Sequence, residues 1–197
     1  MTDRRRSLLN AAVEQIAANG ARGLRIEQVA RAAGVSTALI YHHFGDRTTL
    51  LISALEHIGD RATAYTTPAI GTGRDMLFQV LVDEIQDDPT IRTNSAAWGE
   101  LRDTAIFDEA LRPTIGRLTQ RWVYDIAEIV RAGHADATIA AGHDPEVLGV
   151  RLSMLVEGVS ARWLTAQLST PAAREHLAAL ISAVLDGPND PDPKAMT

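Results

Sequence analysis

The sequence predicts an all-α fold. Apolar residues recur at spacings of three and four through most of the 197 residues, as they do on one face of a helix. Two pairs in which an acceptor side chain precedes proline, Asp144-Pro145 and Thr170-Pro171, mark helix starts. Because no segment alternates apolar and polar residues as a half-buried strand does, we expect about nine helices and no sheet.

The chain is expected to divide into three parts. Residues 1–60 should form a three-helix head, and residues 61–186 should form a larger helical body. Residues 187–197 are rich in Pro, Asp and Asn, a composition that predicts a disordered tail.

Local signals predict the three helices of the head. The first helix runs from about residue 4 to 19 and buries one apolar stripe. A short second helix ends at Gly34, since glycine tolerates the left-handed conformation found at helix ends. Ser36 can cap a third helix, in which Ile40 and Phe44 lie one turn apart and can pack against the second helix. Two short helices joined by a tight turn constitute a helix-turn-helix.

The body should contain longer helices. A fourth helix from Asp46 toward Tyr65 links the head to the body, so a change of shape in the body would move the head through it. The remaining helices are expected over about 74–86, 95–105, 108–133 and 144–168, and from Thr170 onward.

The exposed side of the third helix has the composition of a surface that contacts DNA. Small side chains near the helix N-terminus let the backbone approach base edges, and Tyr41 and His42 can donate hydrogen bonds to phosphates. Arg47 stands at the start of the next helix, where a cation and the helix N-terminus together suit a phosphate. The residues expected to contact DNA are Arg25, Ser36, Thr37, Ala38, Leu39, Tyr41, His42 and Arg47.

The stretch Gly-Val-Ser-x-x-x-Ile-Tyr-x-His-Phe-x-x-Arg-x-x-Leu, within residues 34–50, resembles the N-terminal domain of TetR-family transcriptional regulators. The resemblance extends over roughly residues 6–55. It implies that the residues at positions 37–39 face bases, and that Ser36, Tyr41, His42 and Arg47 face phosphates.

Two positions depart from the pattern of the family. Arg47 stands where the family usually has lysine; arginine keeps the charge but changes the geometry. Arg25 stands where the family often has a hydroxyl residue that opens the second helix. The cap is lost there, although Arg25 can itself reach a phosphate.

The charge distribution fits a DNA-binding head on an acidic body. The whole chain carries −6, but residues 1–50 hold seven arginines against four acidic residues, a balance of +3, which leaves −9 for the remainder. Arg4 to Arg6 could reach the DNA backbone or a minor groove. The alternative is that this run is a solvated chain end.

The helix expected from Asp144 carries two apolar faces, and the helix after it adds a third apolar stripe. Surplus apolar surface on two consecutive helices predicts a four-helix interface with a second copy, as the TetR family uses. The alternative is that both faces are buried within one chain. The residues assigned to the interface are Leu148, Leu152, Leu155, Val159, Trp163, Leu177, Leu180, Ile181 and Val184. The different side carries Val150, Met154, Ala161, Leu164 and Leu168.

The resemblance implies that a small molecule binds among the body helices. Indole rings can hold flat or cationic ligands, although aromatic residues at helical spacing commonly belong to a core. Glu157 could bind a cation or a hydrogen-bonding ligand, or instead pair with Arg121 or Arg162. Residues 98–158 resemble, more weakly, the body of betaine-type regulators, which hints at a cationic effector. The candidate lining residues are Phe78, Trp98, Phe107, Trp122, Tyr124, Met154, Glu157 and Trp163.

Several classes of site are not expected. The chain has no cysteine, which excludes disulfides and thiol catalysis. His134, His143 and Asp144 lie in a glycine-broken loop without ligand spacing, so neither a metal nor another cofactor is expected. The first residues lack a signal-peptide apolar run, and no apolar run is long enough to span a membrane, so we expect a cytoplasmic protein without membrane contact.

These features predict a transcriptional regulator. We expect a homodimer that binds a palindromic double-stranded DNA operator and, as is usual in the family, represses transcription until a small-molecule effector releases it. One alternative is an architectural DNA-binding protein without an effector. A helical enzyme is the other alternative, but the sequence has no nucleophile elbow and no catalytic metal spacing.

Overall fold

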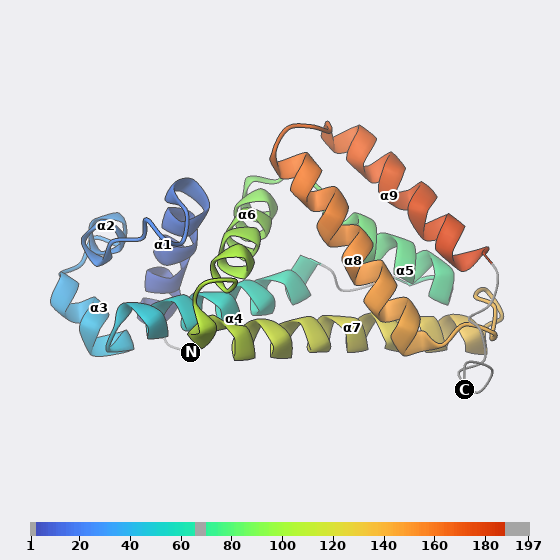
Figure 1. Cartoon of the computed structure of the whole chain (residues 1–197), viewed down its shortest axis with the longest axis horizontal. Helices are drawn as coiled ribbons and strands as arrows, with labels where there is room; N and C mark the ends of the chain where they lie inside the picture. The colour runs from blue at the N-terminus through green and yellow to red at the C-terminus, as the bar shows by residue number, and fades with distance from the viewer. Residues whose placement is uncertain (1–2, 66–69, 188–197) are drawn as a thin grey trace. The chain divides into compact units, whose positions relative to one another are not determined.

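The computed structural model describes residues 3–65 and 70–187, which lie in helices and connecting turns without any strand (Figure 1). This confirms the predicted all-α fold. Over the described ranges the elements are α1 (Asp3–Asn19), α2 (Ile26–Ala32), α3 (Thr37–Phe44), α4 (Arg47–Tyr65), α5 (Gly73–Val82), α6 (Pro89–Thr104), the 3₁₀ helix η1 (Glu109–Leu111), α7 (Arg112–Ala135), α8 (Pro145–Leu164) and α9 (Thr170–Leu185). The predicted disordered tail lies, apart from Gly187, outside the described residues.

Two helix starts differ from the sequence prediction because of their caps. α6 begins at Pro89 rather than near residue 95, since the Asp88 carboxylate accepts hydrogen bonds from the amides of Thr90 and Ile91. α9 is capped by Ser169 and not by Thr170. The Thr170 hydroxyl instead accepts a hydrogen bond from the indole of Trp163, at 2.8 Å.

The described residues form two compact units. The first falls within Met1–Ala64 and Asp87–Leu118, and the second within Tyr65–Gln86 and Thr119–Thr197. The first unit therefore contains α6 and η1 together with the helices of the predicted head.

The core of the first unit joins α1, α2, α3, α4 and α6. α1 packs along α6 as well as on α2, and Figure 1 shows α1 and α6 side by side. The largest fully buried side chains of this core are Leu8, Ile16, Ile40, Leu50, Leu51, Leu55, Ile58 and Leu101. The expected packing of Ile40 and Phe44 beneath α3 is confirmed, because both belong to this core.

The core of the second unit lies among α5, α7, α8 and α9. α8 and α9 form a packed hairpin (Figure 1), and α5 packs on both of them. Most of the stripe that was predicted to face a second copy is buried here within one chain: Leu148, Leu152, Val159, Trp163, Leu177 and Ile181. Leu155 and Val184 are partly buried against the same core, and only Leu180 of the predicted set is exposed. The interface assignment was therefore wrong for this face, which packs onto α5 and α7 instead.

Among the described residues, no helix has the length and apolar character needed to cross a lipid bilayer.

Candidate functional site

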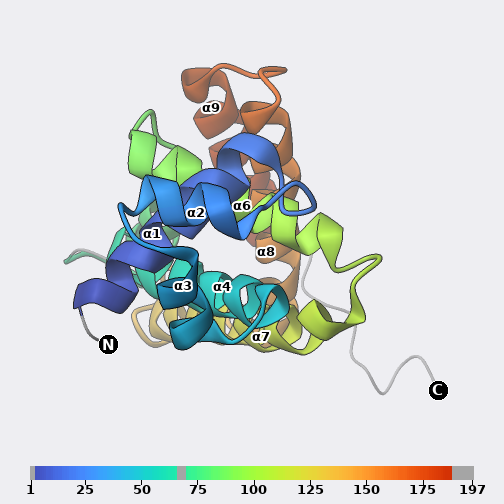
Figure 2. The same ribbon diagram turned by 90° about the vertical axis from the view of Figure 1, so that its left-hand side faces the viewer.

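The turn between α2 and α3 has the geometry of a helix-turn-helix. Gly34 adopts a φ of +65°, which a side chain would strain, and the amide of Val35 donates to the carbonyl of Ala30 at 2.9 Å. The Ser36 hydroxyl then accepts from the amide of Leu39 at 3.3 Å and caps α3. Figure 2 views this unit from the side on which α2 and α3 lie.

α3 separates an apolar face from a polar one. Ile40 and Phe44 point into the core, whereas half of the Tyr41 surface is exposed. The other predicted contact residues on or next to α3 are exposed or partly buried: Ser36, Ala38 and His42 are exposed, and Thr37 and Leu39 are partly buried. The structure thus leaves each of these residues at least partly accessible; that they contact DNA stays a prediction.

The arginines near this surface differ in their exposure and in their hydrogen-bond partners. Arg25 is exposed at the start of α2, and its side chain makes no capping hydrogen bond. Arg5 donates to the carbonyl of His43 at 3.1 Å and to the hydroxyl of Ser53 at 3.0 Å, while its guanidinium lies 4.5 Å from the Phe44 ring centroid. Arg5 therefore joins α1 to α3 and α4 instead of extending outward with Arg4.

Arg47 is partly buried at the start of α4. Its guanidinium donates to the carbonyls of Leu24 at 3.2 Å and Arg22 at 3.4 Å, and also to that of Ala21. The preceding Asp46 accepts from the amide of Thr49 at 2.7 Å, and this bond lowers the pKa of its carboxyl, so the acid stays ionised as a cap. The predicted phosphate contact of Arg47 stays a prediction.

The residues expected to line an effector site are divided between the two units. Trp98 packs against the core of the first unit, and Phe107 is 74% exposed there beneath the guanidinium of Arg22. In the second unit Phe78 and Trp122 are partly buried against the core, and Trp163 is fully buried in it.

The other expected lining residues lie on α7 and α8. Tyr124 and Met154 are largely exposed, so they do not line an interior of the second unit. Glu157 is partly buried on α8.

Glu84 is a candidate that sequence reasoning missed. It is partly buried in the turn after α5, where burial raises the pKa of its carboxyl to about 7 against a smaller opposing effect of a hydrogen bond with Tyr65. The signal in the sequence was an acidic residue directly before Ile85, inside an apolar stripe. A partly buried carboxyl with a pKa near 7 can change its protonation state when a cation binds beside it.

Glu84→Gln is expected to remove a pH dependence of stability. The folded-state pKa of Glu84 lies above the ordinary value of 4.5. Its contribution to the free energy of unfolding is therefore fully favourable below about pH 4.5 and is lost as pH rises through about 7. We expect the variant to be more stable than the wild type at pH 8 by about 3 kcal/mol, and about equally stable at pH 4.5. Urea unfolding at both pH values measures this difference. The exposed control Glu175→Gln should show none, and equal stability of Glu84→Gln and wild type at pH 8 would refute the assignment.

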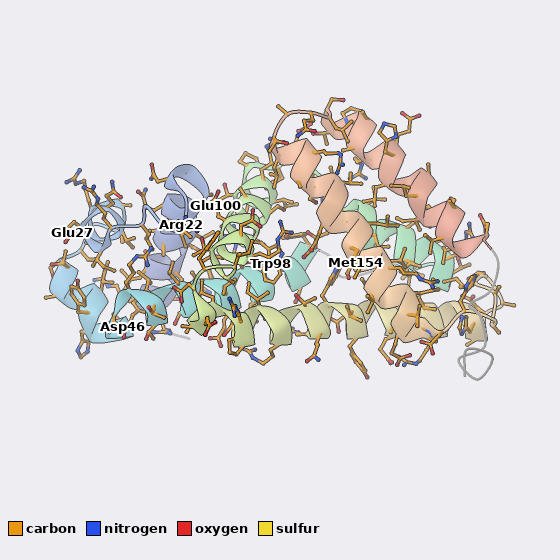
Figure 3. The ribbon with its side chains drawn as sticks, in the orientation of Figure 1. Arg22, Glu27, Asp46, Trp98, Glu100 and Met154 are labelled. Atoms are coloured by element: carbon orange, nitrogen blue, oxygen red, sulfur yellow. The ribbon has the colours of Figure 1, made fainter. Side chains whose placement is uncertain are left out.

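One face of the α8–α9 hairpin is apolar and unburied. Val147, Val150 and Met154 follow one another at helical spacing on α8 and are 38%, 40% and 64% exposed. Leu180 on α9 is 40% exposed, and a Cβ added at Gly158 would meet no atom within 4 Å. Figure 3 shows Met154 on α8. This outer α8–α9 face, defined by these five residues, is apolar surface that a single chain leaves in water.

Both the N-terminal and the C-terminal part of the chain match families of known proteins. Residues 8–54 match bacterial regulatory proteins of the tetR family, and residues 73–186 match the C-terminal domain of BetI-type transcriptional repressors. The HTH-type transcriptional regulator BetI of Brucella anthropi is 30% identical over 98 residues, covering 48% of this chain and 50% of the relative. The chain thus spans about half the length of this curated relative.

Two solved structures resemble nearly the whole chain. A TetR-family transcriptional regulator from a Rhodococcus species is 44% identical with a TM-score of 0.87, and the match covers 94% of this chain and all of that one. A transcriptional regulator from Saccharomonospora viridis in complex with choline is 25% identical with a TM-score of 0.76, over 91% of this chain and 95% of that one. Since the C-terminal match alone covers more than half of the residues, the chain belongs to the TetR family of bacterial regulatory proteins, with a C-terminal domain of the BetI type.

Proposed function

We propose that the protein is a homodimeric transcriptional repressor that binds a palindromic DNA operator and leaves it when a small cation binds. The observation that carries DNA binding is the exposed polar face of α3, held outward by the burial of Ile40 and Phe44. A recognition helix placed in this way fits the major groove, and its flanking donors fit the phosphates.

The outer α8–α9 face supports a dimer. Three exposed apolar side chains at helical spacing on α8, with Leu180 on the adjacent α9, are suited to pack against the same surface of a second copy around a two-fold axis. This face replaces the buried stripe as the proposed interface, with Leu180 common to both. A dimer supplies the two heads that a palindromic operator requires.

A quaternary ammonium compound is the proposed effector. The neighbour from Saccharomonospora viridis was solved with choline, and the C-terminal match is to the BetI type. In this chain Glu84 and Glu157 are partly buried carboxyls of the second unit, and Trp122 is a partly buried indole of the same unit. Carboxylates and aromatic rings are the groups that attract such a cation.

The test is the release of operator DNA by choline. Fluorescence anisotropy with the labelled DNA upstream of the protein's own gene should show binding that millimolar choline weakens at least about tenfold, a typical allosteric coupling. Glu84→Gln should reduce this response, whereas the exposed Glu175→Gln should keep it. Binding that choline leaves unchanged would contradict the proposed effector, and would favour the architectural alternative if no other small molecule acted.

A further inference from the structure

The loop between α1 and α2, residues 20–25, is held at its backbone by side chains from elsewhere in the first unit. Ala21 and Leu24 are buried, and Arg22 is exposed. The loop leads directly into α2, and α2 packs against α3. The position of this loop therefore influences how α3 is presented.

From α4, Arg47 binds three carbonyls of the loop. Its Nε donates to Leu24 and its Nη2 to Ala21 and Arg22. A planar guanidinium can serve several acceptors at once in a fixed geometry, which a lysine ammonium on its flexible stem does not reproduce. A lysine at this position would therefore not hold the three carbonyls in the same way.

From α6, Glu100 binds the same loop. Its Oε2 accepts a hydrogen bond from the amide of Ala21 at 3.3 Å. The Arg22 guanidinium lies 4.3 Å from the ring centroid of Phe107, just after α6. Figure 3 shows Arg22 and Glu100 in this region of the first unit.

The segment that carries Phe107 is itself fixed. Arg112 donates to the carbonyls of Ala105 at 3.0 Å and Ile106 at 2.9 Å, and it pairs with Glu109 at 2.9 Å. Both contacts to the loop from the α6 side therefore come from ordered structure.

We propose that Arg47 and Glu100 are positioning residues for DNA binding, which act through the α1–α2 loop and not by touching DNA. The proposal rests on the proposed function and assigns to Arg47 a role other than the predicted phosphate contact. Arg47 and Glu100 share Ala21, since one binds its carbonyl and the other its amide. Loss of either contact loosens the same loop, so the two losses overlap.

A double-mutant cycle separates positioning from phosphate binding. We expect Arg47→Lys and Glu100→Ala each to weaken operator binding about tenfold. The double variant should also bind only about tenfold more weakly than the wild type, whereas independent effects would weaken binding about 100-fold. Because Arg47→Lys keeps the charge, the salt dependence of binding should not change. Wild-type affinity of Arg47→Lys, or losses that multiply, would overturn the proposal.

Amide hydrogen exchange tests the loop without DNA. Peptides covering residues 20–25 should exchange at least about fivefold faster in Arg47→Lys and in Glu100→Ala than in the wild type, while peptides of α1 stay protected. The exposed control on α1, Glu14→Ala, should change neither exchange nor operator binding. If the wild type itself does not bind its upstream DNA, the proposed function fails. Unchanged exchange in both variants overturns the positioning role by itself.

Discussion

Gly73→Ala is expected to destabilise the second unit by about 3 kcal/mol, as overpacking at a rigid contact does. A Cβ at Gly73 would lie 2.2 Å from the backbone nitrogen of Gly133 and 2.3 Å from its Cα. These atoms belong to the backbone of α7 and cannot rotate away. The start of α5 is also tied there, because the amide of Gly73 donates to Asp136 at 2.7 Å and that of Arg74 to Thr138 at 3.1 Å.

Thermal and urea unfolding at matched protein concentration measure this effect. The control is Gly116→Ala on α7, where an added Cβ meets no atom within 4 Å. Alanine is the better helix former, so this control should be more stable than the wild type by about 0.5–1 kcal/mol. Equal stability of the two alanine variants would contradict the close contact of α5 with α7.

Met154→Arg is expected to convert the proposed dimer to monomers and to abolish tight operator binding. In an isologous interface a substitution appears on both sides of the two-fold axis, so two guanidinium groups would be buried in apolar surface. We expect a loss of self-association of roughly 100-fold or more, and a comparable loss of operator affinity, since each half-site would then bind independently.

Light scattering coupled to gel filtration measures the association. Because Met154 is 64% exposed in the single chain, the variant should fold normally, which circular dichroism checks. The matched control Met154→Leu should remain a dimer. A Met154→Arg variant that remained dimeric and bound its operator as the wild type does would place the interface elsewhere.

The helix-turn-helix could be predicted because its determinants are local. The turn depends on Gly34, the cap on Ser36, and the buried side of α3 on two apolar residues one turn apart. The start of α6 at Pro89 also had a local cause, the cap at Asp88. The helix was expected to begin later because its apolar stripe lies farther along the chain.

The use of each α8 face could not be predicted from periodicity. Both faces carry large apolar side chains, and the pattern alone does not show which face meets the chain's own helices. The structure settles this for one chain, since Leu152 is buried and Met154 is exposed.

The roles of the arginines depend on residues distant in sequence. Arg5 donates hydrogen bonds to His43 and Ser53, and Arg47 donates to the carbonyls of residues 21, 22 and 24. From the sequence, an arginine next to the third helix is therefore expected to contact a phosphate. In the folded chain its N–H donors can instead bond to carbonyls of the protein. Glu84 is similar, since its raised pKa comes from burial that only the fold provides.

The most direct test of DNA reading through α3 is equilibrium binding of the full chain to its own upstream DNA, with an unrelated duplex as competitor. The wild type should bind the upstream DNA at least about 1,000-fold more tightly than the unrelated duplex, with an affinity that falls steeply as salt rises. Tyr41→Ala, on the exposed face of α3, should lose most of this affinity, whereas Tyr124→Ala, at a somewhat more exposed tyrosine on α7, should keep it. Equal affinity of the wild type for both duplexes, or full binding by Tyr41→Ala, would contradict DNA reading by this face.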